Sequence, residues 1–129
     1  MATNPPKPTE AELEILTVLW SLGAPATVRE VFNEISRRRT AQYSTILKFL
    51  QIMAEKGLVT RDERERAHVY TAAKPREWTQ KQLAGDLMQR AFSGSAKALL
   101  LGALSSRKAS SKELEELRNL LDEYEARNK

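Results

Sequence analysis

The sequence predicts a mainly helical α+β protein, in which three short helices precede a small β-hairpin and further helices follow it. Two observations indicate this fold. Apolar residues recur every three or four positions before residue 57 and again after residue 76, which is the spacing of helices. Between these stretches lie two segments of residues that favour β-strands. With 41% hydrophobic and 29% charged residues, the chain is too apolar for disorder. It also lacks the run of about 20 apolar residues that a membrane span needs.

The first two predicted helices each begin at a threonine. Thr9 and Thr27 each precede a glutamate by three residues, the spacing at which a hydroxyl and a carboxylate cap the free amides of a first helical turn. Apolar side chains follow at helical spacing, and Gly23 is expected to end the first helix. Residues 1–8, three of them proline, are expected to form a flexible arm.

The third predicted helix covers about residues 41–56 and ends at Gly57. Two β-favouring segments, 58–61 and 68–71, follow it and are separated by a polar run, which predicts a hairpin. Three helices and a hairpin make a winged helix-turn-helix domain, here predicted over residues 9–76. In this arrangement the third helix enters the major groove of DNA, and the hairpin (the wing, residues 58–71) lies along the flanking backbone.

Residues 77–129 are predicted to form a helical dimerisation region. Thr79 is the expected cap of its first helix, and Ser110 with Glu113 forms a third capping box before the last helix. About fifty residues in short helices are close to the limit below which a core seldom stands alone, so a second copy of the chain is the simplest cover. Apolar faces on these helices are the candidates for dimerisation, and the last helix has the spacing of a coiled-coil seam over two heptads. The candidates are Leu87, Leu99, Leu100 and Leu104, and in the last helix Leu114, Leu117, Leu121 and Tyr124.

Positive charge is concentrated in the middle of the chain. The formal net charge is only +4, but residues 37–76 hold ten Lys and Arg against four Asp and Glu. Polar side chains near the start of the third helix could reach base edges, and wing arginines could reach phosphates. The candidate DNA-binding residues are Gln42, Tyr43, Ser44, Thr45, Lys48, Arg61, Arg64 and Arg66. The alternative is an ordinary solvated helix face and a wing whose acidic residues cancel the arginines.

No catalytic site, cofactor or metal site is expected. The chain has no cysteine and only one histidine, His68, which excludes disulfides, thiolate chemistry and a histidine cluster. It has no glycine-rich phosphate loop, nucleophile elbow or His-Glu-x-x-His spacing. Because the N-terminal residues lack the order of a signal peptide, the protein is expected to be cytoplasmic and not to bind membranes directly.

Several segments resemble, in the same order, the penicillinase repressor family of the BlaI/MecI/CopY type. Segments 8–16 and 26–31 resemble its opening, 43–47, 55–59 and 67–70 its recognition helix and wing, and 92–95 and 113–117 its dimerisation region. The resemblance implies a homodimer that binds a palindromic operator and represses genes, typically for β-lactam resistance or metal handling. It also implies DNA contact around Ser44, Thr45 and Lys48.

The chain departs from this family pattern at three places. The wing turn has Glu65-Arg66 where family members often place glycine, and the cysteine-rich tail of the copper-responsive members is missing. In β-lactam-responsive members a sensor protease cuts an Asn-Phe bond before the last helix, so the resemblance makes a membrane sensor protease a candidate partner. Alignment on residues 110–117 places that bond between Gly102 and Ala103, where neither residue matches.

Two other functions stay open at this point. A winged helix can serve as a protein-interaction module in a larger assembly. The chain could also be a ligand-sensing regulator with a pocket between its C-terminal helices.

Overall fold

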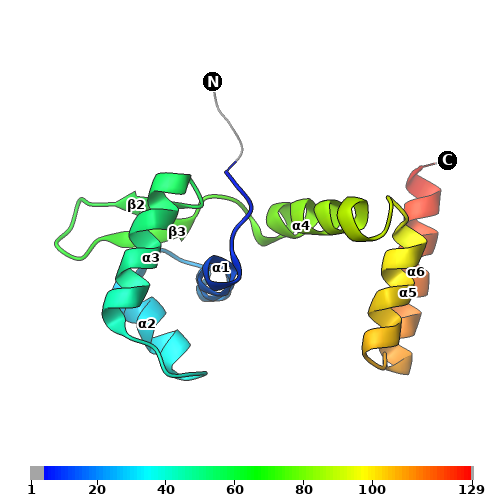
Figure 1. Ribbon diagram of the computed structural model, residues 1–129, viewed down its shortest axis with the longest axis horizontal. Helices are drawn as coiled ribbons and strands as arrows, with labels where there is room; N and C mark the ends of the chain where they lie inside the picture. The colour runs from blue at the N-terminus through cyan, green and yellow to red at the C-terminus, as the bar shows by residue number, and fades with distance from the viewer. Residues whose placement is uncertain (1–4, 129) are drawn as a thin grey trace. The chain divides into compact units, whose positions relative to one another are not determined.

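The computed structural model describes residues 5–128. Its elements in chain order (Figure 1) are α1 (Glu10–Leu22), β1 (Ala26–Thr27), α2 (Val28–Ser36), α3 (Tyr43–Lys56), β2 (Val59–Asp62), β3 (Val69–Ala72), α4 (Arg76–Ala91), α5 (Ala96–Ser106) and α6 (Ser111–Arg127). They form two compact units, Met1–Ala84 and Gly85–Lys129, and α4 begins in the first and ends in the second. The mainly helical fold with a small sheet is confirmed.

The first two helices begin at the two predicted capping boxes. At Thr9 and at Thr27 the hydroxyl accepts a hydrogen bond from the glutamate amide three residues on, and that glutamate accepts one from the threonine amide. Gly23 ends α1 and Gly57 ends α3 at φ values of 69° and 81°, where a residue with a Cβ is strained. Local chemistry therefore sets the ends of these helices, as predicted.

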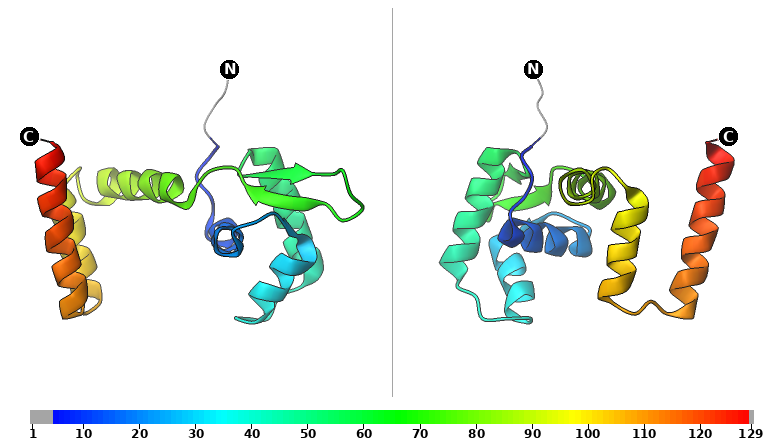
Figure 2. Two further views of the ribbon diagram at one scale, coloured as in Figure 1. Left: turned by 180° about the vertical axis from the view of Figure 1, so that it is seen from behind. Right: turned by 45° about the vertical axis from the view of Figure 1, so that its right-hand side comes forward.

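The sheet has three antiparallel strands in the order β1-β3-β2. β2 and β3 form the predicted hairpin, with Val59 opposite Ala72, and the hairpin projects past α3 (Figures 1 and 2). The third strand, β1, was not predicted. It pairs Ala26 with Tyr70 and Thr27 with Val69, and so joins the first residues of β3 to the segment between α1 and α2.

A single core holds the first unit together. It draws apolar side chains from α1, α2, α3 and the hairpin, each worth about 1.5–3 kcal/mol when a large side chain is fully buried. These side chains are Ile15, Leu16, Val18, Leu19, Ala26, Val28, Val31, Ile35, Ile46, Leu50, Met53, Leu58, Val59 and Tyr70. Because one side of α3 is fixed in this core, its opposite side is presented to solvent in a defined orientation.

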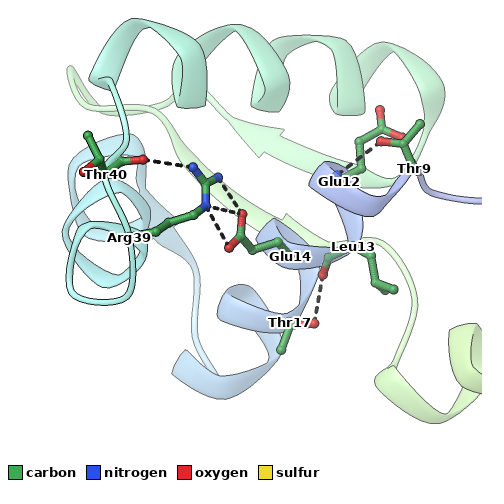
Figure 3. A network of polar contacts seen from close by, with 7 residues as sticks. All are labelled: Thr9, Glu12, Leu13, Glu14, Thr17, Arg39 and Thr40. Atoms are coloured by element: carbon green, nitrogen blue, oxygen red, sulfur yellow. Dashed lines mark hydrogen bonds and ion pairs between the residues drawn. The ribbon is translucent and has the colours of Figure 1, made fainter.

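Two ion pairs connect α1 to more distant parts of the first unit. Lys56, at the end of α3, lies 2.8 Å from a carboxylate oxygen of the buried Glu12. After α2, Arg39 forks onto Glu14, with Nη2 2.6 Å from Oε1, and donates to the Thr40 carbonyl (Figure 3). The hydrogen bond from Arg39 lowers the pKa of Glu14. Arg39 therefore helps to hold the loop that leads into α3.

The predicted cap at Thr79 is wrong. α4 begins at Arg76, directly after Pro75, whose carbonyl accepts the Thr79 amide as the first bond of the helix. Proline suits the start of a helix because its missing N–H would have no partner there. Thr79 lies one turn further on and is buried. No helix between residues 5 and 128 is both long enough and apolar enough to cross a membrane.

In the second unit, α5 and α6 run in opposite directions and are joined by the loop at 107–110 (Figure 2). Ser95 caps α5 by accepting the Ala98 amide, and Ser110 caps α6 by accepting the Glu113 amide, as predicted. Neither helix has a buried residue. This unit therefore lacks a core of the kind that holds the first unit.

Candidate DNA-binding interface

The exposed side of α3 is polar. Ile46, Leu50 and Met53 point into the core, so the residues between them face outward. Gln42 is the N-cap residue, but its side chain makes no capping hydrogen bond, which leaves its amide group for other partners. All five residues predicted here are exposed: Gln42, Tyr43, Ser44, Thr45 and Lys48. Such hydroxyl, amide and ammonium groups are the ones that read base edges and phosphates.

The three predicted wing arginines differ in their partners. Arg64 forks onto Asp62, with Nη2 2.6 Å from Oδ2, and this hydrogen bond lowers the pKa of Asp62 to about 2. Arg61 pairs with Glu63, Nη2 to Oε1 at 2.5 Å. Arg66 makes no ion pair with any described residue. Of the three, Arg66 is therefore the one whose charge is not already neutralised by a neighbour.

Arg61 and Arg66 line a groove between α3 and the hairpin. Besides apolar residues, its lining comprises Thr27, Arg29, Tyr43, Gln51, Arg61, Arg66, His68 and Tyr70. Three of these are arginines, and no carboxylate of the described chain lines the groove. Because it lies between the predicted reading helix and the wing, the basic groove continues the exposed polar face of α3.

Sequence reasoning did not assign several lining residues of this groove to DNA binding: Thr27, Arg29, Gln51, His68 and Tyr70. Arg29 falls inside the capping box and family-like segment at the start of α2, and Gln51 was not singled out. The available signal was helical spacing: both fall opposite the buried stripes of their helices and are exposed. That pattern shows exposure, but it does not show that the two positions share a groove.

The predicted dimerisation residues lie on the three C-terminal helices. Leu87, Leu100, Leu104, Leu121 and Tyr124 are exposed, and Leu99, Leu114 and Leu117 are partly buried. Two leucines that were not predicted are more exposed than most of these, Leu101 at 63% and Leu120 at 54%. The second unit therefore leaves large apolar side chains exposed to solvent.

An apolar pocket lies elsewhere in the first unit, between the arm and the start of α4. Its walls include Pro5, Pro8, Leu16, Leu58 and Trp78. Residues 5–8 of the predicted flexible arm thus lie against the domain, and residues 1–4 of that arm are outside the described residues. The pocket is separate from the basic groove, with which it shares no residue.

Three helices, a sheet with a projecting hairpin and a basic groove beside an exposed polar helix define a winged-helix DNA-binding protein. The family model described as Penicillinase repressor matches residues 8–123. The chain therefore belongs to the penicillinase repressor family, as the resemblance predicted.

Known relatives share nearly the whole chain. The transcriptional regulator BlaI of Mycobacterium tuberculosis is 35% identical over 118 residues, which cover 91% of this chain and 84% of that protein. The penicillinase repressor of Bacillus licheniformis is 27% identical over 124 residues, 96% of each chain. A solution structure of monomeric Bacillus licheniformis BlaI in complex with the blaP half-operator aligns at a TM-score of 0.49 and 28% identity, covering 57% of this chain and 89% of that one.

Membership of this family settles the class of activity. The chain is a transcriptional repressor that binds operator DNA, and it is not an enzyme. The predictions of a winged-helix repressor and of a non-enzymatic protein are confirmed.

Proposed function

We propose that the chain acts in the cytoplasm as a homodimeric repressor of a palindromic operator, with α3 in the major groove and the hairpin along the flanking backbone. The observation that carries this proposal is the polar face of α3, held outward by its buried stripe and adjoining a basic groove. Ser44, Thr45 and Lys48 are the side chains placed to meet bases or phosphates. Lys48 forms no ion pair within residues 5–128, so its charge is available to DNA.

Dimerisation through the second unit supports this mode of binding. Neither α5 nor α6 buries a residue, and leucines such as Leu101 and Leu121 are more than half exposed. A second copy of the chain brings the same apolar face, which is what a two-fold interface requires. Two copies related by a two-fold axis would present two α3 helices to two half-sites of a palindrome.

The regulated genes and the inducing signal are proposed from the relatives. Because two relatives are repressors of penicillinase, we propose a β-lactam-resistance operon or a related stress operon as the target, and a membrane sensor protease as a candidate partner. Gly102 and Ala103 occupy the position of the Asn-Phe bond that such a protease cuts. Phe92 lies against this glycine, with its Cε1 3.3 Å from where a Cβ would stand. A protease that needs phenylalanine after the cut bond should leave this chain intact.

Alanine substitutions in α3 test the proposal. Thr45→Ala and Lys48→Ala should each weaken binding to DNA from upstream of the chain's own gene, with about 1–3 kcal/mol for a base contact and less for a phosphate contact. Lys97→Ala, an exposed lysine on α5, is the matched control and should bind as the parent does. Fluorescence anisotropy gives the affinities, and circular dichroism checks the fold. Parent-like binding by both α3 variants would refute the assignment of α3 as the reading helix.

A further inference from the structure

Arg29 packs against the start of α3. It is the second residue of α2, and its guanidinium carbon lies 4.4 Å from the centroid of the Tyr43 ring and 5.6 Å from that of Phe32. The two rings meet edge to face, with centroids 5.7 Å apart and planes at 71°. Arg29 is exposed and makes no ion pair with the described chain. Arg29, Tyr43 and Phe32 therefore form one packed cluster at the junction of α2 and α3.

This cluster brings a third arginine to the basic groove. Arg29 lines it from α2, and Arg61 and Arg66 line it from the hairpin. Arg61 is paired with Glu63, but Arg29 and Arg66 have no carboxylate partner in the described chain, and two uncompensated like charges in one groove favour an anionic partner. A protein with a helix in the major groove and a hairpin on the flanking backbone must straddle the phosphate strand between the two. The groove lies between those two elements.

We propose that the groove seats one phosphate strand of duplex DNA, and that Arg29 is a phosphate contact outside both α3 and the hairpin, held in place by stacking on Tyr43. This inference rests on the proposed function and names further residues of its site. A guanidinium that stacks through its flat face keeps its N–H edge free to donate to a phosphate. Tyr43 then acts as a positioning residue for Arg29.

Salt dependence of DNA binding tests the phosphate contact. Fluorescence anisotropy measures how the logarithm of the DNA affinity changes with the logarithm of the salt concentration, between about 50 and 200 mM. Two DNA probes are used: the duplex from upstream of the chain's own gene and a random-sequence duplex of equal length. Arg29→Gln should make the slope shallower by about 0.9 for each bound chain, or about 1.8 for a dimer, and weaken binding to both duplexes by the same factor. Arg29→Lys keeps the charge, so it should keep the slope while binding more weakly than the parent. Arg118→Gln, which removes an exposed arginine from α6, should leave slope and affinity unchanged.

A double-mutant cycle tests the positioning role of Tyr43. In a Tyr43→Leu background the guanidinium loses its stacking partner, so Arg29→Gln should reduce affinity by a smaller factor than it does in the parent. Equal factors in both backgrounds would overturn that role.

Two outcomes would overturn the phosphate contact itself. One is a parent-like slope for Arg29→Gln, and the other is a loss confined to the upstream duplex, which would make Arg29 a base-reading residue. If the parent binds both duplexes equally, the proposed operator recognition fails, while the slope on the random duplex still decides the phosphate contact.

Discussion

Replacing Lys56 by methionine should destabilise the first unit more than replacing its partner Glu12 by glutamine. The Glu12 side chain is 2% exposed and the Lys56 side chain 37%. One carboxylate oxygen of Glu12 accepts from Lys56 Nζ at 2.8 Å, and the other accepts from the Thr9 amide at 2.9 Å. Lys56→Met leaves a buried carboxylate without its counter-ion. In Glu12→Gln the lysine can turn to water, and the amide oxygen can still accept from Thr9.

The exposed fractions set the expected size of the two effects. Removing one partner of a fully buried pair costs about 3–5 kcal/mol. Here the Thr9 amide remains bonded to Glu12, so we expect about 2–3 kcal/mol for Lys56→Met. Glu12→Gln loses only the charge-assisted bond to a partly solvated lysine, for which we expect about 1 kcal/mol.

The pH dependence of the Glu12 contribution follows from its pKa. Burial acts to raise the pKa of Glu12, but hydrogen bonds from Lys56 and the Thr9 amide outweigh it, and the pKa lies below the ordinary 4.5. A carboxyl group with a lowered pKa stabilises the fold fully above its unfolded pKa, and the stabilisation is lost as the pH falls through the folded pKa. The difference between the parent and Glu12→Gln should therefore be full at neutral pH and shrink below pH 4.5.

Urea unfolding of the full chain at one fixed protein concentration measures these effects, because a dimer's stability depends on concentration. Tryptophan fluorescence reports on the first unit, because Trp20 and Trp78 both lie there, and the Trp20 indole N–H donates to the Lys74 carbonyl at 3.0 Å. Lys81→Met, on the exposed side of α4, is the control and should stay within about 0.5 kcal/mol of the parent. A loss for Glu12→Gln equal to or larger than that for Lys56→Met would refute the reasoning from burial.

Five further substitutions test other parts of the structure. Arg66→Ala should weaken DNA binding more than Arg64→Ala, because a wing carboxylate already holds Arg64; equal losses in anisotropy would contradict this. Gly85→Ala should stabilise its helix by about 1 kcal/mol in thermal melts, since a Cβ meets nothing within 4 Å. Gly102→Ala should gain less, because an aromatic carbon lies 3.3 Å away. Leu121→Ser should shift a parent dimer towards monomer in sedimentation, and an unchanged dimer would exclude Leu121 from the interface.

Features set by neighbouring residues were predictable from the sequence. The capping boxes at Thr9 and Thr27 and the glycine ends of α1 and α3 depend on residues within one helical turn, and the structure has them as predicted. β1 was missed because two residues are too short to show a strand period, and the strand exists only through its pairing with β3. The start of α4 was misplaced because Thr79 was preferred as the helix cap. The helix instead begins directly after Pro75.

The candidate site likewise has features that the sequence predicts and features that only the folded structure shows. The exposure of Thr45 and Lys48 follows from the spacing of the buried residues on α3, which is visible in the sequence. Which wing arginine is free of an acidic partner depends on how the turn folds, and alternating charges in the sequence do not decide it. The contact between Arg29 and Tyr43 joins two helices across a loop, so only the packing of α2 on α3 reveals it.

Hydroxyl-radical footprinting tests most directly the claim that two copies of the chain place two α3 helices on one operator. The parent protein is bound to DNA from upstream of its own gene, and native mass spectrometry of the complex gives the number of chains per duplex. The account predicts two chains per duplex and two protected patches related by a dyad, with centres about 10 base pairs or a multiple of that apart. One chain per duplex, or a single footprint without two-fold symmetry, would contradict it.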